Sequence, residues 1–267
     1  MITRARNPLA RRRSIQRALT AHGVMSVEEL CRMAQASPAT VRRDLAALER
    51  DGILERSFGG AALKVERPAE QAFAEREEQD VASKRRIAEA VVERLTPGAT
   101  VFMNDGSTVM AIAREIVASG LELFVATPAV NVAAKLSESA SVMACLLGGF
   151  VRQRSLATAG PFAESMIEQI NADFAIISPD GLAPKHGLTF SHAEDAAIAR
   201  KMGEHARHII AVATSAKFRR LGRIRAMPMG AVGTLISDRV TGVLAGRLHQ
   251  TGVEVIETGS AERDLRQ

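Results

Sequence analysis

Cysteine is scarce in this sequence, and long apolar runs are absent. Cys31 and Cys145 are far apart, form no C-x-x-C motif and have no histidine pair beside them, so we expect reduced, buried packing residues. No apolar run is long enough to span a bilayer, and the N-terminal arginines precede no secretory signal segment. These absences argue against a membrane protein and predict a location in the cytoplasm.

Metal-ligand patterns are also missing. His186, His192, His205 and His208 do not have the spacing of metal ligands, and no cysteine or carboxylate completes a set around them. The sequence has no internal repeat and no low-complexity tract. We therefore predict neither a metal site nor a cofactor.

The charge is unevenly distributed along the chain. Residues 1–67 contain 13 Lys and Arg against 7 Asp and Glu, a net charge of +6, whereas residues 68–267 contain 22 and 23, a net charge of −1. A length of 267 residues favours two domains. The excess of positive charge at one end is typical of a domain that neutralises DNA phosphates.

The segment from Ser37 to Gly60, SPATVRRDLAALERDGILERSFGG, predicts a helix followed by a short strand and a tight turn. Ser37 can cap the helix, and Pro38 suits its first position. Val41, Leu45 and Leu48 form one apolar stripe, which leaves the polar and basic residues on the remaining faces. An alternative is an ordinary amphipathic helix with a solvated basic face.

Two further helices are predicted upstream, over residues 11–21 and 27–34. Ser26 and Glu29 form a capping box at the start of the second one. Three short helices and a hairpin make a winged helix-turn-helix, whose last helix reads DNA. The predicted DNA contacts are Ser37, Thr40, Arg42 and Arg43 from the helix and Arg56 and Ser57 from the wing. Two readings remain open for Arg4, Arg6, Arg11, Arg12 and Arg13, either as a phosphate-binding arm or as a merely solvated tail.

The same residues carry a family resemblance. The runs RRSIQRAL, VMSVEEL and above all TVRRDL followed by the GGA of the wing resemble the DeoR family of bacterial transcriptional regulators. The resemblance implies operator binding by this module.

The rest of the chain predicts an α/β domain. Residues 64–80 are charged, contain Pro68 and are predicted to be a linker. A helix is expected over residues 81–95. Short apolar runs then alternate with helical patterns, which favours a mostly parallel sheet. The expected strands cover residues 100–103, 121–126, 142–147, 174–178, 209–213, 232–237 and 253–257, and the expected helices 110–118, 162–170, 193–205 and 242–251.

Ligands of such sheets bind at the carboxyl ends of the strands, so the loops there supply the candidate residues. The DGST loop combines a glycine with hydroxyls at a helix start and suits an anionic oxygen, although a plain capped turn is an alternative. Thr127, Gly148-Gly149 and Asp180 follow later strands, and Lys217 can neutralise a phosphate or belong to a solvated basic loop. The candidate effector ligands are Asp105, Gly106, Ser107, Thr108, Thr127, Gly148, Gly149, Asp180 and Lys217.

These loops also resemble the DeoR-family sensor domain, which is similar in fold to ribose-5-phosphate isomerase. The DGST loop looks like the family's phosphate-binding DxGTT segment, and LLGG looks like its di-glycine. The chain departs from the family at Thr127-Pro128, where Thr-Asn is common, and at Thr214, where an aspartate is common. The resemblance implies a Rossmann-like sensor of a phosphorylated sugar that also forms a homo-oligomer, a dimer or tetramer.

The sequence as a whole predicts a regulator of sugar metabolism, most often a repressor, that is nucleoid-associated when bound to operator DNA. We expect a winged helix-turn-helix domain at residues 1–63, a linker at 64–80 and an effector-binding and oligomerisation domain at 81–259. Two alternatives remain. One is a sugar-phosphate isomerase-like enzyme with an accessory DNA-binding domain, for which Asp105, Asp180 and Lys217 are nominally available. The other is a DNA-binding scaffold with a degenerate sensor.

Overall fold

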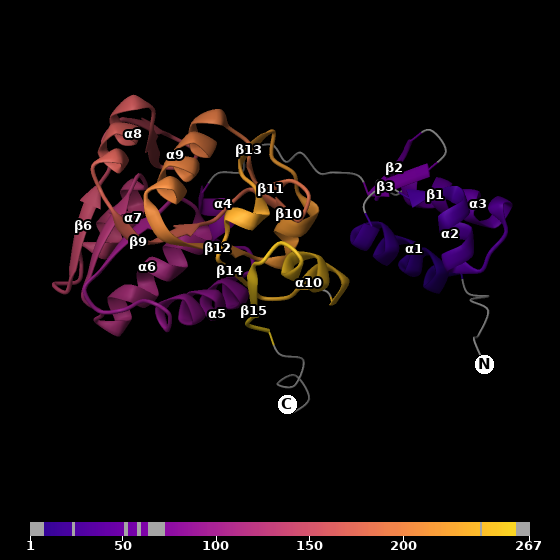
Figure 1. Cartoon of the computed structure of the whole chain (residues 1–267), viewed down its shortest axis with the longest axis horizontal. Coiled ribbons are helices and arrows are strands. Elements are labelled where there is room, and N and C mark those ends of the chain that lie inside the picture. Colours follow the sequence, from indigo (N-terminus) through magenta and orange to yellow (C-terminus); the bar gives the residue numbers. More distant parts are fainter. Residues whose placement is uncertain are drawn as a thin grey trace. The chain divides into compact units, whose positions relative to one another are not determined.

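The chain forms two compact units, residues Met1–Glu66 and Arg67–Gln267. The computed structural model describes residues 8–22, 25–50, 53–57, 60–63, 73–240 and 242–259 (Figure 1). Each unit has its own hydrophobic core and is considered by itself.

The first unit is a winged helix-turn-helix, as the sequence predicts. Three helices precede a hairpin of two strands, and a short strand between the first two helices pairs with the hairpin. These elements are α1 (Pro8–His22), β1 (Met25–Ser26), α2 (Val27–Ala34), α3 (Pro38–Arg50), β2 (Leu54–Ser57) and β3 (Gly60–Leu63). Only β1 was not expected from the sequence.

Local capping defines where the helices of this unit begin. Ser26 and Glu29 form the predicted capping box, with the Ser26 hydroxyl accepting from the Glu29 N–H at 3.2 Å. The Ser37 hydroxyl accepts from the Thr40 N–H at 3.3 Å at the start of α3. Beneath these helices, Ile15, Leu30 and Leu45 are fully buried and hold the unit together.

The second unit is built on a seven-stranded parallel sheet, which confirms the predicted fold class. Its strand order is β15-β14-β12-β9-β4-β5-β6, and every pair in it is parallel. The strands are β4 (Ala99–Met103), β5 (Leu123–Thr127), β6 (Val142–Leu146), β9 (Ala172–Ile177), β12 (Ala206–Ala213), β14 (Thr234–Ser237) and β15 (Glu254–Glu257).

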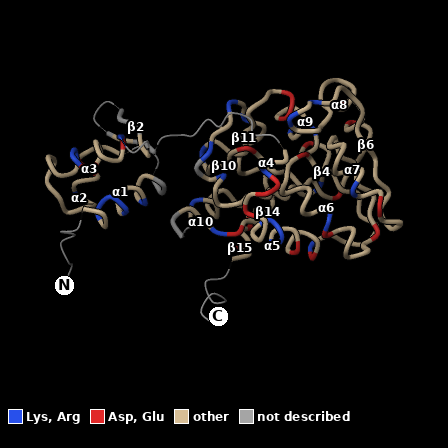
Figure 2. Tube along the Cα trace, turned by 180° about the vertical axis from the view of Figure 1, so that it is seen from behind, with Lys and Arg blue, Asp and Glu red and all other residues tan. Residues whose placement is uncertain are grey.

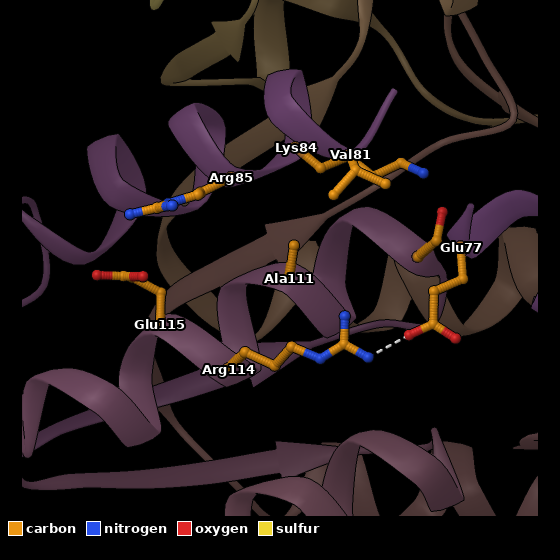
Figure 3. Close-up of a pocket in the computed structure, with 8 residues that line it drawn as sticks. Glu77, Val81, Lys84, Arg85, Ala111, Arg114 and Glu115 are labelled. Atoms are coloured by element: carbon orange, nitrogen blue, oxygen red, sulfur yellow. Dashed lines mark hydrogen bonds and ion pairs between the residues drawn. The ribbon is translucent and has the colours of Figure 1, made fainter. Parts of the chain in front are cut away.

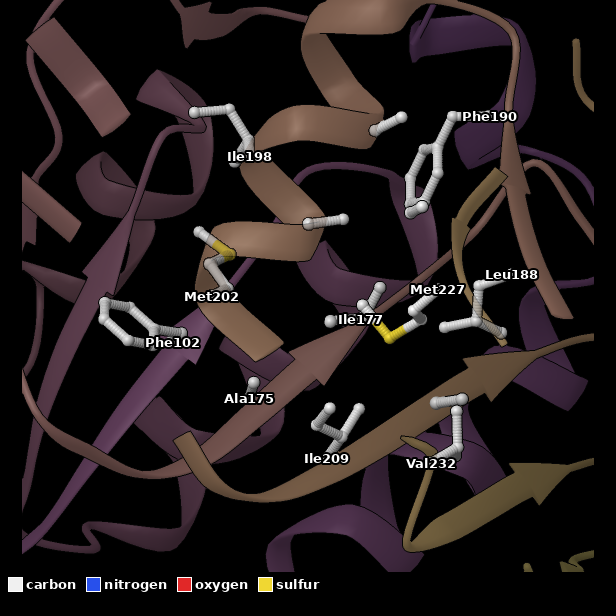
Figure 4. Close-up of a cluster of buried hydrophobic side chains, with 14 of the residues drawn as sticks. Phe102, Ala175, Ile177, Leu188, Phe190, Ile198, Met202, Ile209, Met227 and Val232 are labelled. Carbon is white, nitrogen blue, oxygen red and sulfur yellow. The ribbon is translucent and has the colours of Figure 1, made fainter. Parts of the chain in front are cut away.

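Helices cover both faces of this sheet (Figure 1). One face packs against α5 (Val81–Val92), α6 (Ser107–Ser119) and α7 (Val130–Leu136), and the other against α8 (Pro161–Glu168), α9 (Ala193–Glu204) and α10 (Gly242–His249). Successive side chains of β4 point to opposite faces. Val101 and Met103 lie in the first core, beneath α5, α6 and α7, and Phe102 lies in the second core, beneath α8, α9 and α10. Figure 4 shows the second core, with Met202 of α9 among the side chains from the sheet.

Several elements of this unit were not expected from the sequence. A three-stranded antiparallel sheet consists of β10 (Gly181–Ala183), β11 (Gly187–Phe190) and β13 (Ile224–Met227), and a separate hairpin of β7 (Phe150–Arg152) and β8 (Ala157–Ala159). The 3₁₀ turns η1 (Ser215–Arg219) and η2 (Met229–Ala231) and the helix α7 were also missed.

The segment predicted as a linker contains a helix, α4 (Phe73–Glu77). The side chain of Phe73 is buried in the core beneath α5 and α6, so residues 73–80 belong structurally to the second unit. The helix α6 begins at Ser107, three residues before its predicted start. No helix in the described part of the chain is long and apolar enough to cross a membrane.

Candidate DNA interface and effector site

The helix α3 presents the predicted DNA contacts to solvent. Its buried stripe comprises Val41, Leu45 and Leu48, and Arg42 and Arg43 are exposed beside it. Figure 2 shows that basic residues gather on α1 and α3 in this unit. Ser37 and Thr40 lie at the start of α3, where their hydroxyls are 2.9 Å apart. Because the Ser37 hydroxyl also caps the helix, its first role is structural.

Asp44 of the RRD run is buried and binds two arginines of α1. It is 2% exposed, and its carboxylate accepts from Nε of Arg11 at 2.5 Å and from Nε of Arg12 at 3.2 Å. Neither of the two readings left open for Arg11 and Arg12, a phosphate-binding arm or a solvated tail, includes this role, because both side chains tie α1 to α3. Arg13 is exposed, and Arg4 and Arg6 lie outside the described residues.

The structure describes the backbone, but not the side chains, of the two DNA contacts predicted from the wing. Arg56 and Ser57 belong to β2, and Ser57 pairs with Gly60 of β3 across the turn. The side chains of these two residues, like residues 58 and 59, lie outside the described part of the chain.

Three of the predicted effector loops lie where the order of the strands in the sheet reverses. From β4 the chain runs outward to β5 and β6, and then returns to β9, which pairs with the other side of β4 and continues to β12. A crevice at the carboxyl ends of strands forms at such a switch point, here between β4 and β9. Asp105 follows β4, Asp180 follows β9 and Lys217 follows β12, so three predicted residues come from adjacent strands.

A network centred on Ser178 connects these loops. Asn104 is buried and exchanges two hydrogen bonds with the Ser178 backbone, at 2.8 and 3.1 Å. The ammonium of Lys217 donates to the Ser178 hydroxyl at 3.2 Å and to the Pro179 carbonyl at 2.5 Å. At Gly106 the backbone has φ 117°, and a Cβ there would lie 3.9 Å from the Ser178 hydroxyl. The loop after β4 is therefore held against the loop after β9.

The ionisable groups at this edge are electrostatically perturbed. Burial raises the pKa of Asp105 to about 7, and Asp195 and Asp180 add to the rise, whereas Arg76 opposes it. Burial lowers the pKa of Lys217 to about 8, with Asp180 acting in the opposite direction. Burial also raises the pKa of Asp195, although its 2.5 Å ion pair with Arg152 opposes the rise. At neutral pH, Asp105 therefore holds a proton more readily than an ordinary aspartate does, and Lys217 loses its proton more readily than an ordinary lysine.

Chemically, this edge offers both kinds of group that a phosphorylated polyol needs. The start of α6 at Gly106 has no side-chain cap, so its backbone N–H groups can face an anion beside Lys217. Carboxylates accept hydrogen bonds from hydroxyls. Asp180 already accepts one hydrogen bond from a backbone amide, the Ser191 N–H at 2.7 Å, which fixes its orientation.

Three predicted ligands have other contacts. The Thr127 hydroxyl accepts from the Ala129 N–H at 3.2 Å and donates to the Asn104 carbonyl at 3.4 Å, so it braces the loop after β5. The Gly148 N–H points to the sulfur of Met166 at 3.0 Å. Gly149 has φ 139°, and a Cβ there would lie 2.9 Å from the Ala159 carbonyl oxygen. The di-glycine thus permits the close approach of β7 and β8.

Thr108 and Ser107 lie in the first turn of α6, and both are buried. Ser107 is one of the residues that line a cavity of about 260 Å³. Figure 3 shows this cavity with lining side chains from α4, α5 and α6. Much of the charge around this cavity is already paired: Arg114 with Glu77, and the Lys84 ammonium with the carbonyls of Arg76 and Gln79. None of Asp105, Asp180 and Lys217 lines it.

Sequence reasoning missed Ser178 and the Arg152–Asp195 pair. Ser178 ends a predicted strand, and no local signal indicates that Lys217 and Asn104 bind it across 39 and 74 residues. Asp195 lies in the first turn of α9, and its partner Arg152 comes from β7, a strand that was not predicted. Among the residues that the structure describes, no group of three or more His, Cys, Asp or Glu could hold a metal ion. Cys31 and Cys145, expected to be buried, are both half-buried free thiols.

Comparison with known families covers both units. Residues 11–67 match the model of the DeoR-like helix-turn-helix domain, and residues 79–239 match that of the DeoR C-terminal sensor domain. The chain belongs to the DeoR family. It is 34% identical over 231 residues to the HTH-type transcriptional regulator GlpR of Haloferax volcanii, covering 86% of this chain and 90% of the relative.

Two further proteins are similar to this DeoR-family chain. The glycerol-3-phosphate regulon repressor of Escherichia coli K12 is 30% identical over 213 residues, 79% of this chain and 81% of the relative. Ribose 5-phosphate isomerase A of Neisseria gonorrhoeae has a TM-score of 0.39 and 12% identity, over 53% of this chain and 54% of the enzyme.

Membership of the DeoR family decides between the regulator and the enzyme. Both matched domains are those of a regulator, and the full-length relatives are named as a transcriptional regulator and a repressor. The chain is therefore a DNA-binding transcriptional regulator with a sensor domain, and not an enzyme.

Proposed function

We propose that this regulator represses an operon of carbohydrate metabolism and that a phosphorylated sugar metabolite controls its affinity for the operator. The observation that carries the proposal is the meeting of the uncapped start of α6, Lys217 and the carboxylates Asp105 and Asp180 at the switch point of the sheet. The relative named glycerol-3-phosphate regulon repressor supports a phosphorylated polyol as the chemical class of the metabolite.

The effector would bind with its phosphate at the start of α6 and Lys217 and its hydroxyls at the carboxylates. Asp105, Gly106, Ser107, Thr108, Asp180 and Lys217 are the proposed ligands. Ser107 would contribute its backbone N–H at the start of α6, because it also lines the separate cavity between α4, α5 and α6. Thr127, Gly148 and Gly149 would shape the site rather than bind the effector, because each has the structural contact described above. Regulation then requires that the effector bind the operator-competent and operator-free forms with unequal affinity.

In the DNA-binding unit, Arg42 and Arg43 are the proposed contacts of α3 with base edges and phosphates. Thr40 and Ser37 would add hydroxyl contacts at the helix start, and Arg56 and Ser57 would bring the wing to the DNA backbone. A regulator of this kind works at the nucleoid, where the operator is.

The experiment that tests the effector site compares Lys217→Met with the matched exposed variant Lys185→Met. Wild-type protein and both variants are titrated with a panel of pentose and hexose monophosphates while thermal stability and operator binding are followed. Loss of a charge-assisted hydrogen bond predicts that Lys217→Met binds the effector about 1.5–3 kcal/mol more weakly. Equal affinities for wild type and Lys217→Met would refute this placement of the phosphate, and a wild type that binds none of the panel would support the degenerate-sensor alternative.

We also propose that the protein is a homo-oligomer that uses the β6 edge of the sheet. The two edges differ: β15 carries Glu254 and Glu257, whereas β6, with the sequence VMACL, carries no charge. Charged residues protect an edge strand from pairing, so only the β6 edge is left open to another chain. A second copy is the occupant that fits, because antiparallel pairing of β6 with itself is self-complementary about a twofold axis.

Apolar side chains border this edge and form the β6 patch. Phe150 and Phe162 are 80% and 66% exposed, and their ring centroids lie 6.4 Å apart in an edge-to-face arrangement. The other members are Met143, Leu146, Val151 and Leu156. Together the six side chains offer on the order of 600 Å² of apolar surface, at the upper end for a monomer and close to the roughly 800 Å² per partner of a stable interface.

A further inference from the structure

Three residues of the described chain have buried side-chain polar atoms without a hydrogen-bond partner. They are Arg76 at Nε, Asn131 at both Oδ1 and Nδ2, and Ser155 at Oγ. Buried polar groups are nearly always hydrogen-bonded, because leaving one unpaired costs its full desolvation. Each of these atoms therefore calls for a partner that the polypeptide does not supply.

Backbone hydrogen bonds bring the three segments that carry these residues together. The Phe73 N–H, at the start of α4, donates to the Arg154 carbonyl at 3.1 Å, and the Val130 N–H, at the start of α7, donates to the Leu156 carbonyl at 2.9 Å. Ser155 stands between Arg154 and Leu156. The unpartnered atoms thus come from adjoining pieces of one small region of the second unit.

This region borders the proposed effector site. The Asn131 segment follows the loop in which Thr127 donates to the carbonyl of Asn104, the residue before Asp105. On the other side, α4 packs against α6 through the Glu77–Arg114 ion pair. The charge of Arg76 also acts on the site, since it lowers the pKa of both Asp105 and Lys217.

Arg76 is a cation that lacks an anion here. Asp195 is paired with Arg152, Glu77 is paired with Arg114, and Asp180 accepts from the Ser191 N–H. The remaining carboxylate on which Arg76 acts, Asp105, is a weak counter-ion because burial raises its pKa. The backbone carbonyl of Arg76 accepts from the Lys84 ammonium, which fixes the residue's main chain while its guanidinium remains available. A guanidinium, an amide and a hydroxyl carried by adjoining segments make a donor set for a phosphate or carboxylate.

We propose that Arg76, Asn131 and Ser155 form an anion subsite of the effector site, and that Arg76 links its occupancy to the DNA-binding unit. The inference rests on the proposed function, to which it adds a ligand from the segment predicted to be a linker. α4 is the first described helix after the winged helix-turn-helix in the chain. An effector held by Arg76 changes how firmly this helix is fixed to the sensor.

The test uses the full chain with Arg76→Met, and Arg94→Met as the matched control. Arg94 pairs with Glu254 at the amino-terminal edge of the sheet, remote from the effector loops. Inorganic phosphate and a panel of pentose and hexose monophosphates are the probes, and their affinities are measured by calorimetry. We expect Arg76→Met to bind the best sugar phosphate roughly 10- to 100-fold more weakly than wild type and Arg94→Met to bind it normally.

Stability of the ligand-free protein separates a ligand role from a structural one. Arg76 has no hydrogen bond through its side chain and no ion pair among the described residues, and its attraction to Asp105 is offset by its repulsion of Lys217. The melting temperature of Arg76→Met should therefore be close to that of wild type. Asn131→Leu and Ser155→Ala should behave in the same way and also weaken binding. A lower melting temperature with unchanged affinity would make these residues structural and overturn the proposal.

Operator release tests the link. At a ligand concentration that saturates Arg76→Met, the variant should stay on its operator whereas wild type dissociates. Normal release at saturation would overturn the coupling role of Arg76. Wild-type affinity in Arg76→Met would overturn the subsite and leave the proposed function standing, whereas a wild-type protein that binds no probe would overturn both.

Discussion

Removal of the Asp44 carboxylate should destabilise the DNA-binding unit more than any change at its DNA-contacting surface. Asp44 is 2% exposed and lies between Arg11 and Arg12, whose side chains are 12% and 31% exposed. Breaking a buried ion pair by removing one partner costs about 3–5 kcal/mol, and the partial exposure of Arg12 reduces this to about 2–4 kcal/mol for Asp44→Ala. Asp44→Asn keeps the volume and one acceptor, so we expect about 1–2 kcal/mol.

Small domains have a low free energy of unfolding, so a loss of this size is a large part of the stability of a unit of this length. Because the chain has no tryptophan, amide hydrogen exchange is the suitable assay, and it separates α1 and α3 from the sensor domain. Arg11→Ala should reduce protection more than Arg12→Ala, since Arg11 is closer and more buried. Glu49→Ala, an exposed acidic residue of the same helix, is the matched control.

The reasoning would be refuted by an Asp44→Ala protein whose α1 amides keep wild-type protection. In that case the carboxylate would contribute no more than an exposed ion pair, for which the typical value is below about 1 kcal/mol. Equal effects of Asp44→Ala and Glu49→Ala would lead to the same conclusion.

Three further predictions concern the other sites. Arg42→Ala and Arg43→Ala should each weaken operator binding by roughly 1–3 kcal/mol, with relaxed sequence selectivity if the contact is to a base, as measured by titration of labelled operator. The free energy of unfolding of the wild type should fall as pH rises from about 4 to about 7, because the raised pKa of Asp105 makes the folded state bind the proton more tightly than the unfolded state does. Asp105→Asn should remove up to about 4 kcal/mol of this pH dependence, as measured by thermal unfolding. Phe150→Ser with Phe162→Ser should shift the protein to a smaller species in sedimentation velocity, because it removes the two aromatic rings of the β6 patch.

Each of these predictions has a control and a contrary outcome. Arg207→Ala removes an exposed charge from the second unit and should leave operator binding unchanged; weakening as large as for Arg42→Ala would point to a general charge effect. Parallel pH profiles for wild type and Asp105→Asn would mean that Asp105 ionises normally. Val81→Ser removes an exposed apolar side chain outside the β6 patch, and an equal shift in both variants would exclude that patch as the interface.

The sequence by itself determined the architecture of the DNA-binding unit and the class of the sensor. Caps and apolar stripes are local signals, so Ser26 with Glu29 and Ser37 with Pro38 marked helix starts that the structure contains. Apolar runs alternating with helical patterns gave the parallel sheet, and the loops after its strands gave Asp105, Asp180 and Lys217 as neighbours.

Only the tertiary structure decided which charges have partners. The sequence favours a solvent-facing role for Arg11 and Arg12 and a linker role for the segment of Arg76, yet two of these side chains bind a buried carboxylate and the third lies unpartnered beside the effector site. The antiparallel strands around that site were missed for the same reason, since β11 pairs with β13 across more than thirty residues. Local periodicity reports which face of an element is buried, whereas the partner of a buried charge depends on which distant segment folds against it.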